Sequence, residues 1–225
     1  MTFNYLNLPH LPKLKETTIN GKRHYVTEDG LILPSVTTIL SAQPKPQVDA
    51  WAKRLGPEKV KQALHKATTR GNGLHFLIES FLNNDDISSV SAMPDATEMM
   101  FALRPYLNKI NNIHYLEVPL FSKLMGMAGR ADCIAHYDGL LSIVDFKQAR
   151  KTRTEAMVHS YLLQATAYAG LYEDMTGMKI KQIVVMMAVE NAKPQIFIKN
   201  PRQYVPDLIN AIKTYKNSLD LTITH

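Results

Sequence analysis

The sequence predicts an α/β fold in which helices flank a central mixed sheet, and two observations lead to this prediction. Helical and strand-like patterns follow one another in the order helices, three strands, helix, one or two strands, helix. Hydrophobic residues make up 45% of the 225 residues and charged residues 20%, a balance that supports a sizeable core and excludes a disordered chain. We therefore expect one globular domain that carries an N-terminal helical extension.

The first 110 residues are expected to form a hairpin followed by helices. Asp29-Gly30, inside the range 23–33, is a hairpin turn signal, and Pro34 ends the second strand. Ser35 suits the N-cap of a short helix over residues 36–40. Three further helices are predicted over residues 48–55, 58–82 and 96–110.

After residue 110 the hydrophobic period changes from helical to strand-like. Three strands are predicted, over residues 115–121, 129–137 and 140–147. A long helix over residues 154–176 should end at Gly177. The strongly apolar range 180–189 predicts a further strand, residues 195–198 can pair with it, and a helix over 206–219 closes the chain.

Composition and charge exclude several classes of protein. The net charge is +6 and the pI is about 9.3, which permits a nucleic-acid partner without requiring one. Cys133 is the single cysteine, so an internal disulfide, a four-cysteine zinc site and a four-cysteine iron–sulfur cluster are excluded. No apolar run approaches the roughly 20 residues of a membrane helix, and the N-terminus lacks the pattern of a signal peptide. We expect a cytoplasmic protein that has no membrane partner.

The range 129–153 carries the residues most indicative of chemistry. If Asp138-Gly139 is a two-residue hairpin loop, counting back from it places Asp132 opposite Asp145, with Cβ atoms about 5 Å apart. Lys147 then projects from the same face as Asp145. Facing carboxylates repel each other, and a divalent cation with oxygen ligands, such as Mg²⁺ or Mn²⁺, would offset the repulsion.

A plain hairpin remains an alternative interpretation of this range. Asp145 and Lys147 can form a solvent-exposed ion pair worth under ~1 kcal/mol. A loop longer than two residues would also change the register and separate the two carboxylates.

Asp132 followed by Asp145-Phe146-Lys147 resembles the PD-(D/E)XK nuclease superfamily, and more narrowly its RecB-like exonuclease branch. Residues 70–75 (RGNGLH) resemble the helical G-x-x-x-H element of that branch, and residues 164–168 (QATAY) its Q-x-x-x-Y motif. Glu117 stands in the first core strand, where relatives often carry an acid. The PSVTTIL run at 34–40, followed by WAK at 51–53, is similar to the start of mitochondrial genome maintenance exonucleases and their bacterial and phage relatives.

The resemblance implies a restriction-endonuclease-like core and assigns roles to residues of this chain. It implies a single nuclease domain over residues 1–225, with a hairpin and helices over the site (1–110), a catalytic core (111–200) and a C-terminal helix (201–225). The implied ligands of one or two Mg²⁺ or Mn²⁺ ions are His75, Asp132, Asp145 and the Phe146 carbonyl. The implied catalytic residues are Asp132, Asp145, Lys147, Gln164 and Tyr168.

Two departures from the family pattern bear on these roles. Gln148 follows the lysine where relatives often carry threonine, and we expect its side chain to point away from the metal. The lack of a cysteine cluster excludes the iron–sulfur subgroup. Structural roles stay open for two of the candidates: His75 also fits a partly buried helix position, and Tyr168 lies on an apolar helix stripe.

Several polar, basic and aromatic residues are candidates for DNA contacts. They are Ser35, Thr37, Thr38, Trp51, Arg70, Arg150 and Lys151. Hydroxyl groups at 35–38 can bind a phosphate, but plain N-capping explains them as well. A base can stack on Trp51, although tryptophan more often packs in a core. The basic run at 150–153 can follow phosphates or simply be a solvated turn.

The sequence therefore predicts a metal-dependent DNA exonuclease that acts on single-stranded or processed ends in replication, recombination or repair, with other proteins of those processes as further partners. A structure- or site-specific endonuclease on the same core, and a non-catalytic nucleic-acid-binding module, are the alternatives. Replacing Asp145 or Lys147 with alanine is expected to abolish cleavage and to leave folding nearly intact.

Overall fold

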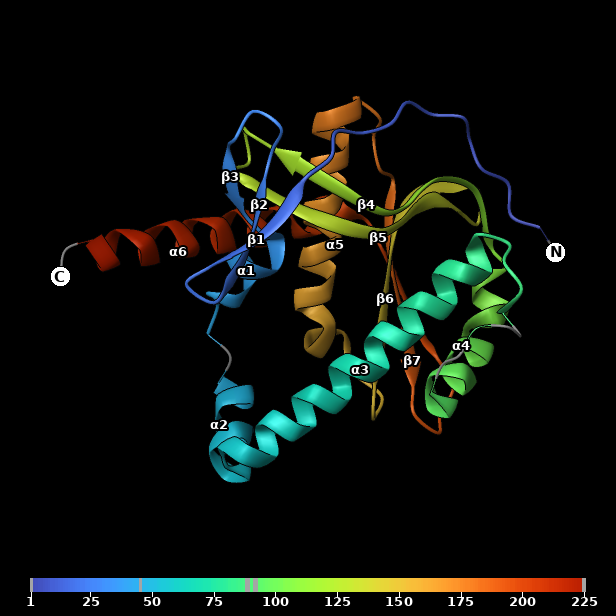
Figure 1. Cartoon of the computed structure of the whole chain (residues 1–225), viewed down its shortest axis with the longest axis horizontal. Helices are drawn as coiled ribbons and strands as arrows, with labels where there is room; N and C mark the ends of the chain where they lie inside the picture. The colour runs from blue at the N-terminus through green and yellow to red at the C-terminus, as the bar shows by residue number, and fades with distance from the viewer. Residues whose placement is uncertain (1, 45, 88–89, 91–92, 224–225) are drawn as a thin grey trace.

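A computed structural model describes residues 2–44, 46–87, 90 and 93–223, and its architecture is α/β with a five-stranded mixed sheet flanked by helices (Figure 1). The fold class predicted from the sequence is confirmed. In the described ranges, no helix combines the length and the apolar character needed to cross a membrane.

A small antiparallel sheet precedes the helices and has the order β1-β2-β3. Its strands are β1 (Lys15–Ile19), β2 (Lys22–Val26) and β3 (Ile32–Pro34). The Asp29-Gly30 turn lies between β2 and β3 as predicted, whereas β1 was not predicted. Asn20 and Gly21, which join β1 to β2, both have positive φ values (51° and 71°), the backbone of a tight hairpin turn that Asn-Gly favours.

Four helices follow, close to the predicted positions. They are α1 (Val36–Ser41), α2 (Pro46–Leu55), α3 (Pro57–Leu82) and α4 (Pro94–Leu107). The helix predicted over 96–110 ends earlier than expected, because Ile110 already begins the next strand. Pro105 lies in the last turn of α4, where its missing N–H removes one helical hydrogen bond shortly before the helix ends at Leu107.

The central sheet has the order β4-β5-β6-β7-β8. Its strands are β4 (Ile110–Ser122), β5 (Met127–Tyr137), β6 (Leu140–Ala149), β7 (Gln182–Val189) and β8 (Gln195–Lys199). All neighbours are antiparallel except β6 and β7, which are parallel and joined through α5 (Glu155–Thr176). A short 3₁₀ turn, η2 (Pro201–Tyr204), leads into the last helix, α6 (Val205–Ile223).

The turn between β5 and β6 has the geometry that the sequence predicted. Asp138 and Gly139 have φ values of 47° and 81°, and the ladder runs from Tyr137 paired with Leu140 to Cys133 paired with Val144. The next position along this register brings Asp132 opposite Asp145. The hairpin register that the argument from Asp138-Gly139 requires is therefore confirmed.

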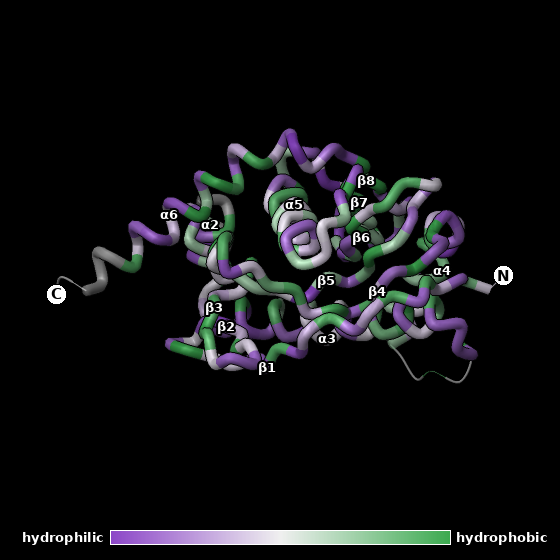
Figure 2. Tube along the Cα trace, turned by 90° about the horizontal axis from the view of Figure 1, so that it is seen from above, coloured by the Kyte–Doolittle hydropathy of each residue, from purple (hydrophilic) through white to green (hydrophobic). Residues whose placement is uncertain are grey.

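Two hydrophobic clusters hold the layers together, one on each face of the sheet. Helices α1, α5 and α6 contribute to the cluster on one face, and α3 and α4 to the cluster on the other. Figure 2 shows α5 on one side of the sheet and α3 on the opposite side. Strand β7 is buried along its whole length, as expected for a strand covered on both faces.

Candidate functional site

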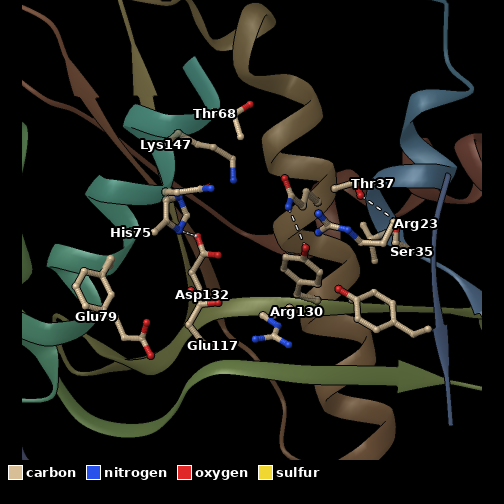
Figure 3. Close-up of a pocket in the computed structure, with 18 residues that line it drawn as sticks. Arg23, Ser35, Thr37, Thr68, His75, Glu79, Glu117, Arg130, Asp132 and Lys147 are labelled. Carbon is tan, nitrogen blue, oxygen red and sulfur yellow. Dashed lines mark hydrogen bonds and ion pairs between the residues drawn. The ribbon is translucent and has the colours of Figure 1, made fainter. Parts of the chain in front are cut away.

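A cavity of about 750 Å³ opens where the small sheet, α1, α3 and α5 meet the middle of the central sheet. Side chains from β2, α1, α3, β4, β5, β6 and α5 line it. In Figure 3, His75, Asp132 and Lys147 lie on one side of this cavity, and Arg23, Ser35 and Thr37 lie on the other. The cavity is within the size range of small-ligand sites in proteins.

Two acidic side chains from the β5–β6 hairpin form the base of the site. Asp132 lies at the cavity wall, and its Oδ2 accepts a hydrogen bond of 2.8 Å from the Phe146 main-chain N–H. Asp145 lies deeper, with 1% of its side chain exposed, and its Oδ2 is 2.5 Å from Lys147 Nζ. The alternative of a solvent-exposed Asp145–Lys147 pair is therefore wrong, because Asp145 is fully buried.

Lys147, the cation of this buried pair, presents its positive charge at the cavity surface. Burial raises the pKa of Asp145 to about 6, against the attraction of the Lys147 ammonium. Burial alone would lower the pKa of Lys147, but the carboxylates of Asp145 and Asp132 more than offset this and raise it. Lys147 therefore stays protonated at neutral pH, and 17% of its side chain remains exposed to the cavity.

A cluster of possible metal ligands, from α3, β4 and β5, lies near this pair. His75, Glu117 and Asp132 each offer a ligand atom, and these atoms all lie within 4.8 Å of one another. His75 Nδ1 is 3.7 Å from Asp132 Oδ2. Burial, with the nearby Asp132 and Glu79 carboxylates, raises the pKa of Glu117 to about 7.

The backbone of β4 is distorted where it delivers Glu117. The pairs on either side, Leu116 with Cys133 and Val118 with Ala131, place Glu117 across from Asp132. Its φ of 45° is unusual for a residue with a side chain and costs on the order of 1–3 kcal/mol. The sequence indicated an acid here but did not identify it as a ligand, because the predicted strands, 115–121 and 129–137, left the ends of the connecting loop undefined and so did not fix the register of β4 against β5.

The chemistry of these side chains fits a hard divalent cation. Among the described residues, Asp145 Oδ1 is a buried carboxylate oxygen without a hydrogen-bond partner. A bound cation can compensate the negative charge of such an oxygen. Three carboxylates and one imidazole in the same region match the oxygen-rich ligand sets of Mg²⁺ and Mn²⁺. His75 and Asp132, predicted as ligands from the sequence, thus lie in one cluster with Glu117. Asp145, the third predicted side-chain ligand, is not part of that cluster, but it lies close enough for Asp132 and His75 to shift its pKa.

The two predicted catalytic residues of α5 meet at the cavity as well. Gln164 Nε2 donates a hydrogen bond of 2.9 Å to Tyr168 Oη, and both side chains line the cavity. Burial raises the pKa of Tyr168, so its phenol stays protonated. Gly129 makes room for this ring, because a Cβ there would be 2.6 Å from Tyr168 Cε1.

The hydroxyl residues before and within α1 divide into two kinds. Ser35 is the N-cap, and its Oγ accepts a 3.0 Å hydrogen bond from Thr38 N–H. Thr38 is buried, and its Oγ1 donates to the Arg23 carbonyl at 2.8 Å. Thr37 is exposed and lines the cavity, and its Oγ1 shares a hydrogen bond of 2.9 Å with Ser35 Oγ. The prediction that Thr38 contacts DNA therefore has no support from its position, because its hydroxyl is used inside the fold.

The position of Arg70 argues against the predicted DNA contact. Only 6% of its side chain is exposed, and its Nη1 is 2.9 Å from Glu190 Oε2 and 3.9 Å from Asp95 Oδ2. Its Nε donates to Gln148 Oε1, and Gln148 Nε2 donates to the Ala67 carbonyl at 2.5 Å. Gln148 thus points to α3, as expected, and Arg70 joins α3 to the sheet.

The remaining candidates for DNA contacts lie away from the cavity or are not described. Arg150 and Lys151 are exposed after β6 but do not line the cavity. The side chain of Trp51 lies outside the described residues, so its predicted role stays a prediction. The role of the Phe146 carbonyl as a metal ligand also stays a prediction.

Comparison with known proteins bears on the identity of this site. No family model matches the chain. The mouse mitochondrial genome maintenance exonuclease 1 is 24% identical over 147 residues, which cover 61% of this chain and 44% of that protein. The human protein of the same name is 22% identical over 182 residues, or 72% of this chain and 51% of that protein.

The chain is similar in sequence to exonucleases. This similarity confirms the resemblance that the motifs indicated, and the chain spans about half the length of the curated relatives that it matches. A solved structure from Eubacterium rectale, provisionally described as an exonuclease, matches 65% of this chain and 63% of its own, with a TM-score of 0.45 and 12% identity.

Proposed function

We propose that this protein is a divalent-metal-dependent deoxyribonuclease, an exonuclease that hydrolyses phosphodiester bonds at the ends of single-stranded or processed DNA. The observation that carries the proposal is the buried Asp145–Lys147 ion pair together with the His75, Glu117 and Asp132 cluster, because Lys147 and the three residues of the cluster line one open cavity. The similarity to exonucleases supports the same conclusion.

His75, Glu117, Asp132 and Asp145 are the side chains that would hold one or two Mg²⁺ or Mn²⁺ ions, with the Phe146 carbonyl as a further ligand. When bound, the metal supplies an acidified water and positive charge at the phosphate. The raised pKa of Glu117 indicates that the site is short of positive charge, which a divalent ion would provide.

Lys147 stabilises negative charge that develops on the phosphate oxygens during hydrolysis. Its ammonium stays protonated between two carboxylates, so it acts as a donor and an electrostatic group rather than as a base. The ion pair with Asp145 fixes its position before substrate arrives. Such preorganised charge needs no rearrangement at the moment of reaction.

Gln164 and Tyr168 orient the substrate from α5. Because the Gln164 amide donates to Tyr168 Oη, the phenol proton remains available for another acceptor. A phosphate oxygen in the cavity is such an acceptor. We also propose that residues 1–225 act as one domain, since the cavity is lined by residues from Arg23 to Tyr168.

End-labelled linear single and double strands, and circular single-stranded DNA, test the proposal with Mg²⁺, with Mn²⁺ and with EDTA. We expect linear strands to be degraded only with a metal, and circles to survive. Asp132→Asn should reduce cleavage at least about 100-fold, while Asp207→Asn, the same change at an exposed position outside the cavity, should not. Cleavage of circles would indicate an endonuclease on the same core. Metal-independent cleavage, or full activity of Asp132→Asn, would refute the proposed mechanism.

A further inference from the structure

Two arginines line the cavity, and nothing in the proposed hydrolysis has used them. Arg23 comes from β2 and Arg130 from β5. Figure 3 shows Arg23 across the cavity from His75, and Arg130 below them beside Glu117. The cavity therefore offers positive charge for an anion as well as the acidic cluster that can hold a cation.

Arg130 has no partner that would explain its place. Its side chain is exposed to the cavity, and its guanidinium makes no ion pair or hydrogen bond within the described part of the chain. It lies close enough to Glu117 and to Tyr25 to lower the pKa of both groups against the effect of burial. An unpaired guanidinium at a cavity wall is a ready donor of two parallel hydrogen bonds to a phosphate.

Arg23 is held rigidly at its backbone while half of its side chain is exposed. Its carbonyl accepts hydrogen bonds from Ser35 N–H at 3.0 Å and from Thr38 Oγ1 at 2.8 Å, so β2 is tied to α1 at this point. Its Nε is 3.2 Å from Glu16 Oε1 at the surface. Arg23 also acts electrostatically on the buried Tyr25, as Arg130 does, so the two guanidinium groups share one region.

We propose that Arg23 and Arg130, with the exposed hydroxyl of Thr37, form a phosphate subsite separate from the acidic cluster. The inference rests on the proposed function, because a nucleic-acid strand is the ligand that carries a second phosphate next to the one being hydrolysed. Two cations that face one space repel each other until an anion lies between them. The subsite takes either the neighbouring internal phosphodiester or a terminal phosphate.

A thermodynamic cycle between protein and DNA tests the subsite. The affinity of short labelled single strands is measured in EDTA, where the proposed cleavage is absent. One series carries a single uncharged methylphosphonate linkage at successive positions, and another carries a 5′-phosphate, a 3′-phosphate or hydroxyl ends. The proteins are the wild type, Arg130→Gln, Arg23→Gln and Arg202→Gln. Arg202 is exposed and lies outside the cavity, so it is the matched control.

Neutralising the bound phosphate should weaken wild-type binding about 10-fold, and the same DNA change should alter binding to Arg130→Gln by less than about 2-fold. Arg23→Gln should behave in the same way, and Arg202→Gln like the wild type. Dependence on one internal linkage identifies a phosphodiester, whereas dependence on an end group identifies a terminal phosphate.

The two proposals fail in different ways. If the wild type binds and cuts DNA but neither arginine variant couples to any phosphate, the subsite is refuted and the nuclease proposal stands. If the strands do not bind in EDTA, the subsite is refuted too, because its residues need no metal. If the protein also cuts no strand with Mn²⁺, the proposed function itself fails.

Discussion

Replacing Lys147 with methionine should destabilise the metal-free protein strongly, because it leaves the Asp145 carboxylate buried without its partner. Nζ and Oδ2 are 2.5 Å apart, and the exposed fractions of the two side chains are 17% and 1%. At an effective dielectric constant of about 20, a pair at that distance attracts by about 7 kcal/mol. Desolvation of the ammonium offsets part of this, so we expect a net loss of about 3–5 kcal/mol in the free energy of unfolding.

The pH dependence of this loss has a definite sign. Lys147→Met removes the largest opposition to the burial of the Asp145 charge and leaves only the weaker effect of His75, so the folded-state pKa of Asp145 rises further above the unfolded value. A raised carboxyl pKa destabilises the fold as pH rises above the unfolded pKa, because the folded state then has to bury a charge. The loss in the free energy of unfolding caused by Lys147→Met should therefore be larger at pH 8 than at pH 5. This contradicts the sequence-based expectation that changes at Lys147 leave folding nearly intact.

Urea unfolding in EDTA measures the effect, with wild type, Lys147→Met, Asp145→Asn and the double variant at both pH values. We expect the double variant to be more stable than Lys147→Met at pH 8, since an amide needs no counter-charge. A Lys147→Met protein within about 0.5 kcal/mol of the wild type at pH 8, or a double variant no more stable than that single variant, would refute the reasoning.

Three further predictions follow from the same geometry. The folded-state pKa of Glu117 is about 7, above its ordinary 4.5, so metal-free stability should fall as pH rises through that window. Thermal unfolding should therefore show a larger gain from Mn²⁺ at pH 8 than at pH 5.5, and Glu117→Gln should reduce the difference, the remainder coming from Asp145, whose pKa is about 6. Gly129→Ala should lower the free energy of unfolding by about 1–3 kcal/mol, because the methyl group of the new alanine meets the buried Tyr168 ring. Calorimetry should record a melting temperature lower by several degrees, and an unchanged melting temperature would contradict this contact. Arg70→Met should lower the free energy of unfolding in urea by about 1–3 kcal/mol, because it breaks the contact of Arg70 with the partly exposed Glu190. The same variant should bind DNA within about 2-fold of the wild-type affinity. A large loss of affinity would restore the predicted role of Arg70 in DNA binding.

The sequence predicted the part of the site that a two-residue turn controls. Asp138-Gly139 fixes the register of β5 and β6, so the positions of Asp132, Asp145 and Lys147 follow from the alternation of side chains alone. The spacing of Gln164 and Tyr168 on one helix face is equally local, and the structure adds a hydrogen bond between the two side chains.

The features that the sequence did not predict depend on contacts between distant segments. Glu117 reaches Asp132 through the pairing of β4 with β5, whose register the sequence did not fix because the predicted strands left the ends of the connecting loop undefined. The partner of Arg70, Glu190, lies 120 residues away, so a buried structural arginine looked like a DNA contact. Arg130 and Arg23 meet at one cavity only because β2 packs beside β5. The Asn20-Gly21 turn of the first hairpin, by contrast, was a local signal that was overlooked.

Binding of Mn²⁺, followed by the loss of its free-ion electron paramagnetic resonance signal, tests the central claim most directly. The account predicts that the wild type binds one or two ions, and that Asp132→Asn combined with Glu117→Gln abolishes this binding while Asp207→Asn preserves it. Equal Mn²⁺ binding by the wild type and the Asp132→Asn, Glu117→Gln protein would contradict the assignment of this cluster as a metal site.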